Sequence, residues 1–161
     1  MVEIKSEPYT ITFGIIGAGR IGKLHADNLL SHVKGAKLKT VTDPFLDESW
    51  AASRNIPETG KDHRIMLDDP EIDAILIGSP SPEHAAQMIE CARARKHIFC
   101  EKPIALDPDI IRNALAEVEK SCVKLQVGFN RRFDPNFAAV QGQIASGALG
   151  EPHIIRITSR D

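Results

Sequence analysis

A glycine-rich turn carries the clearest chemical signal in the sequence. Gly17-Ala18-Gly19-Arg20-Ile21-Gly22 follows the apolar run Ile11 to Ile16 and opens a segment with helical spacing of apolar residues. In this context the first glycine makes a tight turn, the second lets a pyrophosphate approach the backbone, and the third allows close helix packing. The alternative is a turn that binds nothing. The residues predicted to bind a dinucleotide here are Gly17, Gly19, Arg20, Ile21 and Gly22.

An acidic residue after the second apolar run would select the cofactor. Asp43 lies about 20 positions beyond Gly22, the spacing at which a carboxylate meets the adenosine ribose. A 2′-phosphate would face a like charge there, and the adjacent Pro44 and Phe45 supply no cation. The sequence therefore favours NAD over NADP, although an Asp-Pro pair is equally typical of a turn without a ligand.

Three polar loops follow later apolar runs and should lie at the carboxyl edge of a sheet, where ligands bind in open α/β folds. The first contains Ser79 and Pro80, which we expect to contact the cofactor. The second is Glu101-Lys102-Pro103, where the alternative is a solvated surface lysine. The third is the run 128–133, where the alternative is a polar loop with both phenylalanines turned inward.

The elements that position these loops alternate between strand-length apolar runs and longer amphipathic segments, which indicates βαβ units and a parallel sheet. We predict a Rossmann-type doubly wound sheet with strand order 3-2-1-4-5-6. The predicted strands are Ile11 to Ile16, Leu38 to Thr42, Ile72 to Ile77, His97 to Cys100 and Val123 to Val127, with a weaker one at Thr59 to Asp62.

Helices between these strands show apolar stripes at i, i+3, i+4 and i+7. Ser81-Pro82, Asp107-Pro108 and Asp134-Pro135 are predicted helix starts, because the first residue can cap and proline suits the first turn. The last helix should stop at Gly147. The predicted stripes are Ala26, Leu29, Leu30 and Val33; Ala85, Met88, Ile89 and Ala92; and Ile111, Ala114, Leu115 and Val118.

Composition excludes several classes of function. A formal net charge of −2 over 161 residues gives no basic field for nucleic acid or an anionic membrane, and no apolar run approaches the ~20 residues of a membrane span. The N-terminal residues lack a secretory signal, so we expect a cytoplasmic protein. Cys91, Cys100 and Cys122 are scattered, which predicts reduced thiols in or near the core and no metal site.

Four motifs in order resemble the Gfo/Idh/MocA oxidoreductase family, and most of all its inositol 2-dehydrogenases. They are the turn 17–22, Glu101-Lys102-Pro103, the run 128–134 and Gly150-Glu151-Pro152. The resemblance implies that Lys102 bonds the hydroxyl being oxidised and that Glu101 and Pro103 shape the nicotinamide pocket, with a possible cis bond before Pro103. It also implies that His84 lies near the cleft, where the alternative is a histidine on the helix surface or in packing. Asn130 and Arg132 would lie near the nicotinamide or the substrate.

The resemblance also sets the expected domain organisation. We expect an NAD-binding domain over residues 1–150, and at 151–161 the start of a substrate-binding domain whose remainder is not encoded here. His153 to Ser159 would be that domain's first strand. The expected function is NAD-dependent oxidation of a polyol or sugar by a full-length homo-oligomer, with the chain alone inactive because it offers no good general base.

Two other classes of function remain open at this point. One is a non-catalytic dinucleotide-binding module that acts as a sensor or as a partner-binding domain. The other is a methyltransferase on a similar sheet, which gives no reason for Glu-Lys-Pro after the fifth strand.

Overall fold

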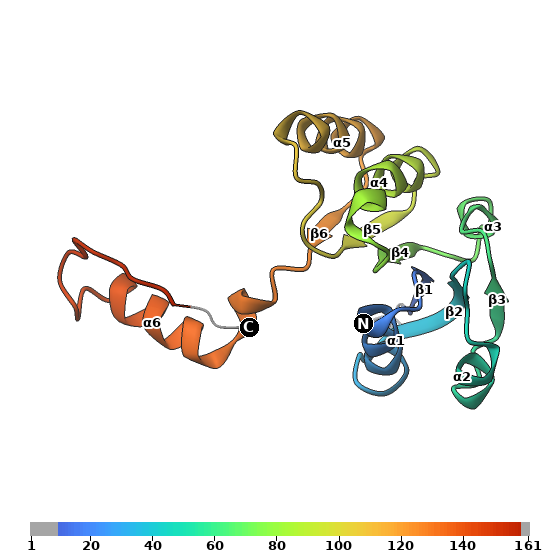
Figure 1. The fold of residues 1–161 in the computed structure, drawn as a ribbon, viewed down its shortest axis with the longest axis horizontal. Coiled ribbons are helices and arrows are strands. Elements are labelled where there is room, and N and C mark those ends of the chain that lie inside the picture. The colour runs from blue at the N-terminus through green and yellow to red at the C-terminus, as the bar shows by residue number, and fades with distance from the viewer. Residues whose placement is uncertain (1–9, 159–161) are drawn as a thin grey trace, which may run out of the picture. The chain divides into compact units, whose positions relative to one another are not determined.

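A computed structural model describes residues 10–158 of the chain. Six parallel strands form one sheet in the order β3-β2-β1-β4-β5-β6, which confirms the predicted topology (Figure 1). The strands are β1 Ile11–Ile16, β2 Ala36–Thr42, β3 Glu58–Gly60, β4 Ala74–Ile77, β5 His97–Cys100 and β6 Leu125–Val127.

Helices cover both faces of this sheet. On one face, α4 and α5 pack against each other (Figure 1), while α1 contacts β1 and β2. The helices are α1 Arg20–Ser31, α2 Glu48–Ser53, α3 Arg64–Leu67, α4 His84–Arg93, α5 Pro108–Ser121 and α6 Pro135–Ala145, with 3₁₀ turns η1 Ser81–Glu83 and η2 Asn130–Phe133.

The strands divide their side chains between two cores, as the period of two in a strand requires. Ile16 and Ile75 lie in the core beneath α4 and α5. Ile15 and Leu76, their chain neighbours, lie in the core that α1 and α2 cover. The strands are therefore buried on both faces, which explains their continuous apolar sequences.

The apolar stripes are only partly buried. Leu30, Val33 and Leu115 are more than 40% exposed. Leu30 and Leu115 are exposed because each helix buries only part of its apolar stripe, and Val33 lies beyond the end of α1. Gly22 is buried on α1 together with Ala26 and Leu29, which confirms the close helix packing predicted for the third glycine of the turn.

Two of the three predicted caps are present. Asp107 accepts a hydrogen bond from the N–H of Asp109, and Asp134 accepts bonds from the N–H groups of Asn136 and Phe137. Ser81 is not a cap, because it begins a 3₁₀ turn that leads into α4. Gly147 follows the end of α6 with a φ of +73°, as a C′ glycine does.

The cysteines are free thiols, and two of the three match the expectation. Burial raises the pKa of the Cys91 and Cys100 thiols to about 12. Cys122, in contrast, is exposed at the end of α5, where it has a left-handed backbone with φ +55°.

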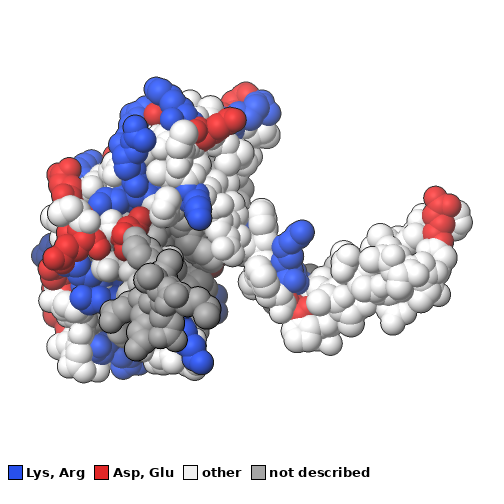
Figure 2. All heavy atoms as spheres, turned by 180° about the vertical axis from the view of Figure 1, so that it is seen from behind, with Lys and Arg blue, Asp and Glu red and all other residues white. Residues whose placement is uncertain are grey.

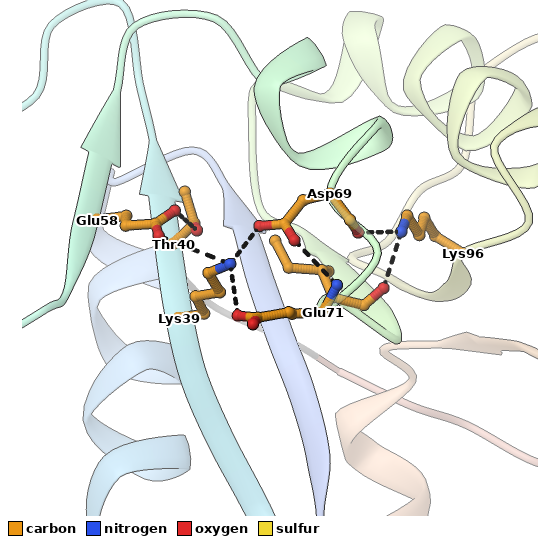
Figure 3. A network of polar contacts seen from close by, with 7 residues as sticks. Lys39, Thr40, Glu58, Asp69, Glu71 and Lys96 are labelled. Atoms are coloured by element: carbon orange, nitrogen blue, oxygen red, sulfur yellow. Dashed lines mark hydrogen bonds and ion pairs between the residues drawn. The ribbon is translucent and has the colours of Figure 1, made fainter.

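An ionic cluster ties β2 to the segment before β4, away from the glycine turn (Figure 3). Lys39 Nζ lies 2.6 Å from an Asp69 carboxylate oxygen and 2.9 Å from one of Glu71, and Glu58 lies further away at 3.6 Å. Lys96 donates to backbone carbonyl oxygens of the same segment, at Asp69 and Ile72.

The chain divides into two compact units at Gly128 and Phe129, so the boundary expected at residue 150 stays a prediction. The first unit contains the whole sheet. Within the described part of the second unit, 129–158, α6 is followed by residues without regular structure. The strand predicted over His153 to Ser159 is not formed at residues 153–158, where no described strand pairs with it. No helix among residues 10–158 could cross a membrane.

Candidate functional site

The glycine turn has the geometry that its spacing predicts. Gly17 has a φ of +93°, and a Cβ there would lie 2.6 Å from the Ser79 nitrogen. A Cβ on Gly22 would lie 1.9 Å from the Gly17 carbonyl oxygen, so α1 can begin this close to the turn only with glycine. Around Gly19, by contrast, a Cβ would meet nothing within 4 Å. Two glycines are thus required by packing, and the third leaves open space in front of the backbone.

This open space lies at the N-terminus of α1. Gly19 is the N-cap, its position has no side-chain cap, and the first turn contains no acidic residue. N–H groups at such a terminus lack intrahelical acceptors and carry partial positive charge. The turn therefore fits a pyrophosphate, which would supply the missing acceptors.

Asp43 lies beside the turn and holds it. One carboxylate oxygen accepts the Ala18 N–H at 2.7 Å, and the other accepts the Phe45 N–H at 2.8 Å. A carboxylate has about four acceptor positions, so capacity remains for ribose hydroxyls. Predicted residues from three loops meet in one cleft of about 550 Å³, which is lined by Gly17, Asp43, Phe45, Ser79 and Pro80 among others.

The cleft also contains cations that the sequence neighbours of Asp43 did not indicate. Lys61, in the loop between β3 and α3, and Arg64, the first residue of α3, line its wall. Arg64 is paired with Asp62, Nη1 to Oδ2 at 3.1 Å, and the Arg64 backbone N–H holds the pKa of Asp62 below its usual range. Asp62 and Glu83 in the same lining offset the two cations. Only the weak β3 signal pointed to this loop.

Ser79 and Gln87 form a polar pair at the cleft wall. The Ser79 hydroxyl donates to Gln87 Oε1 at 2.6 Å, and both residues line the cleft. The hydroxyl oxygen still has lone pairs for a ligand, so its predicted cofactor contact remains available.

Lys102 lies on an exposed loop directly after β5, at the same carboxyl edge of the sheet. Among the described residues no carboxylate pairs with its ammonium group. The Lys102–Pro103 peptide bond is cis, which confirms the bond implied by the family resemblance. The Glu101 carboxylate accepts hydrogen bonds from His25 Nε2 at 2.9 Å and from the Lys102 N–H at 3.2 Å.

His84 lies near this edge as a buried packing histidine, one of the two interpretations that its sequence position allowed. Its ring is 1% exposed. Nδ1 lies 2.8 Å from the Pro103 carbonyl oxygen and Nε2 lies 2.8 Å from that of Ser79. The side chain thus links two loops, and direct contact with a cofactor stays a prediction that this geometry does not favour.

Asn130 and Arg132 belong to the second unit, on the 3₁₀ turn η2, and both are exposed. Phe129 and Phe133 are 60% and 73% exposed, so the alternative with both rings turned inward is wrong. Arg131 lies over the Phe137 ring at 5.0 Å. The predicted cofactor contacts of Asn130 and Arg132 remain predictions.

Sequence comparison finds one family profile over most of the first unit. The Gfo/Idh/MocA profile, described as an oxidoreductase family with an NAD-binding Rossmann fold, matches residues 11–129. An uncharacterized oxidoreductase, YrbE, from Bacillus subtilis is 50% identical over 94% of the chain. Myo-inositol 2-dehydrogenase of Thermotoga maritima is 39% identical over 92% of the chain. The chain spans 45% of the length of each relative.

Comparison with solved structures also finds an inositol dehydrogenase. Scyllo-inositol dehydrogenase from Lactobacillus casei, solved with NAD(H) and scyllo-inositol bound, has a TM-score of 0.83 and 34% sequence identity. The match covers 88% of this chain and 43% of that one. The similarity thus again concerns about half of a longer protein.

Proposed function

Because the chain belongs to the Gfo/Idh/MocA family of oxidoreductases with an NAD-binding Rossmann fold, we propose that it is the cofactor-binding part of an NAD-dependent polyol or sugar dehydrogenase, with inositol the first substrate to test. The observation that carries the proposal is the common sheet edge. There the uncapped N-terminus of α1, the Asp43 cleft and the exposed Lys102 ammonium all follow parallel strands.

The residues divide the work of binding along this edge. Backbone N–H groups from Gly19 onward bind the pyrophosphate, since the first turn of α1 offers them no other acceptor. Asp43 binds a ribose hydroxyl with its remaining lone pairs. When bound, NAD supplies the hydride acceptor.

Lys102 acts at the reacting end. Its exposed ammonium group donates to the substrate hydroxyl and stabilises negative charge that develops on that oxygen. Proton removal needs a general base within hydrogen-bond reach of this hydroxyl. In this proposal that base belongs to a substrate-binding domain that begins near residue 151, and the full-length form is a homo-oligomer.

Calorimetric titration tests the binding part of the proposal. We expect NAD to bind the chain, and Gly19→Val to abolish binding because its side chain fills the space in front of the α1 N-terminus. Gly142→Val is the matched control, since Gly142 on α6 is equally open but outside the turn. No binding to the unchanged chain, or equal binding by both variants, would contradict the proposal.

A turnover assay tests the chemical part. In the full-length protein, NADH should form with inositol or another polyol, and Lys102→Ala should remove most of that rate. A protein that binds NAD firmly but oxidises no member of a polyol panel would instead support a non-catalytic sensor or partner-binding module.

A further inference from the structure

Two histidines from different helices contact the residues on either side of Lys102. His25 lies in the middle of α1 and reaches Glu101, while His84 is the first residue of α4 and reaches Pro103. Lys102 itself is exposed on a loop that belongs to no helix or strand. The fixed points of this loop are therefore its two neighbours.

The His25 contact is a partly buried ion-pair geometry. His25 Nε2 lies 2.9 Å from Glu101 Oε1, and the two side chains are 19% and 13% exposed. Because a carboxylate only accepts, Nε2 donates. The edge of the ring packs on Phe99, with centroids 5.2 Å apart, which fixes the ring plane. The second Glu101 oxygen accepts the Lys102 N–H at 3.2 Å, so one carboxylate joins α1 to the backbone of Lys102.

Gly128 makes room for this carboxylate. A Cβ at Gly128, just after β6, would lie 3.0 Å from Glu101 Oε1 and 3.2 Å from Oε2. The end of β6 thus leaves space for the Glu101 carboxylate. Gly128 does not have a positive φ, so the space that it leaves for the carboxylate, and not its backbone angle, is what a side chain there would disturb.

His84 is a buried residue whose contacts join two loops. Its ring nitrogens lie 2.8 Å from the carbonyl oxygens of Pro103 and Ser79. Both partners are carbonyl acceptors, and a neutral imidazole carries one N–H, so the tautomer decides which of the two carbonyl oxygens accepts a hydrogen bond from the ring while the other is in close contact. Ser79 lines the cofactor cleft, so His84 connects that wall to the residue after Lys102.

We infer that His25 and His84 are positioning residues that clamp the Glu101-Lys102-Pro103 loop between α1 and α4. The inference rests on the proposed function for its consequence, namely that Lys102 is held at a fixed place relative to the dinucleotide. α1 begins at the pyrophosphate turn, and Ser79 lines the cleft. The two histidine contacts therefore fix the position of Lys102 relative to the elements that bind the cofactor. Such precision matters because small displacements of a reacting group cost large factors in rate.

The test compares substitutions that remove the N–H donors with substitutions that keep one. His25→Leu and His84→Leu remove the donors at similar volume, whereas His25→Gln and His84→Gln retain an amide donor. His32→Leu is the matched control, because His32 is exposed at the end of α1. The first measurement is amide hydrogen exchange at Glu101, Lys102 and Ile104 in the chain without NAD, since Pro103 has no N–H.

We expect both leucine variants to speed exchange of this loop by roughly tenfold, with glutamine restoring most of the protection. Should a leucine variant fail to fold, Gly128→Ala replaces it in this measurement. Its methyl group crowds the Glu101 carboxylate and leaves both histidines in place, so exchange of the loop should again be faster. Exchange equal to that of His32→Leu in every variant would overturn the inference.

The second measurement is reductive methylation of Lys102, quantified with and without NAD. NAD should slow modification in the unchanged chain and in the glutamine variants, and less so in the leucine variants. Fast loop exchange in the leucine variants, with no effect of NAD on Lys102 in any chain, would support the clamp and count against the proposed function. Full NAD protection in the leucine variants would overturn the positioning role.

Discussion

The Asp43 carboxylate holds the glycine turn through the Ala18 N–H and retains acceptor positions for a ribose. A substitution that keeps the shape of the side chain but removes its charge separates these two roles. Asp43→Asn should weaken NAD binding by about 1 to 3 kcal/mol, since a charge-assisted hydrogen bond is lost. NADP should be affected less, because the same change removes repulsion of its 2′-phosphate. Calorimetric titration with both dinucleotides measures the difference.

Asp68→Asn is the matched control for this change, because Asp68 is exposed at the end of α3 and outside the cleft lining. Equal or tighter binding of NADP by the unchanged chain would contradict the role of Asp43. Lys61 and Arg64 would then be the residues to substitute next, since they are the cations of the cleft.

Single residues at the site were predictable where one local motif defined them. The turn 17–22 and Asp43 need only strand, turn and spacing, and their predicted meeting with Ser79 is present in the cleft. His25 was not predicted, because its partner Glu101 is 76 positions away and only the sheet order brings them together. His84 was predicted near the cleft, but the burial of its ring depends on two distant carbonyl groups.

At the scale of elements, the ionic cluster on β2 makes a separate contribution to stability (Figure 3). Lys39→Met should lower the melting temperature by several degrees, because Asp69 and Glu71 would then face each other without the cation. Lys37→Met, at an exposed residue of the same strand for which no ion pair is formed among the described residues, should leave it nearly unchanged. Thermal unfolding of the three chains measures this, and equal losses for both variants would exclude a specific role for the cluster.

Acid should remove the same contribution. The hydrogen bond from Lys39 lowers the pKa of Asp69 and raises that of Lys39. A carboxyl with a lowered folded-state pKa stabilises the fold above its unfolded value, near pH ~4, and this stability is lost as the pH falls below it. The difference between the unchanged chain and Lys39→Met should therefore shrink on acidification below about pH 4.

How well each helix and strand was predicted depends on how clear its own sequence pattern is. β1 and β5 were predicted with their observed bounds, because both are short apolar runs between clear breaks. β4 begins two residues later than predicted, at Ala74. Helices α2 and α3 were not predicted, because six and four residues are too short to show an apolar stripe. The strand predicted from His153 is not formed at residues 153–158, because a strand needs a pairing partner and the periodicity of one segment does not specify that partner.

For the molecule as a whole, the second unit presents an apolar surface. Ile154, Ile155 and Ile157 are 90%, 70% and 73% exposed, and α6 adds Val140 at 57%. Figure 2 shows few charged side chains on the visible face of this unit. We expect the isolated chain to self-associate through these residues, since exposed apolar patches of this kind promote association.

Light scattering over a range of concentrations measures this association. Replacing Ile154, Ile155 and Ile157 by lysine should give a monomer. The matched control replaces Leu24, Ile65 and Leu106 by lysine, exposed apolar residues of the first unit, and should leave the association in place. An unchanged chain that is monomeric at all concentrations would contradict the prediction.

The last prediction concerns the division of labour between binding and catalysis. Under the proposed function, this 161-residue chain binds NAD but does not oxidise inositol or other polyols at a useful rate. Lys102 is exposed and serves in the proposed function as a hydrogen-bond donor to the hydroxyl, and the carboxylate of the adjacent Glu101 is already bonded to His25. Missing general-base catalysis alone costs roughly a hundredfold to ten-thousandfold.

NADH absorbance over a panel of polyols, inositol first, measures the residual rate, with calorimetry on the same sample to show that NAD is bound. Lys102→Ala serves as the comparison. If the unchanged chain turns over rapidly and Lys102→Ala abolishes the rate, the chain contains its own base, and Glu101 paired with His25 becomes the group to substitute first. If NAD binds and both chains are equally slow, the groups on this sheet edge hold the cofactor and orient a hydroxyl, and proton removal requires residues that these 161 do not include.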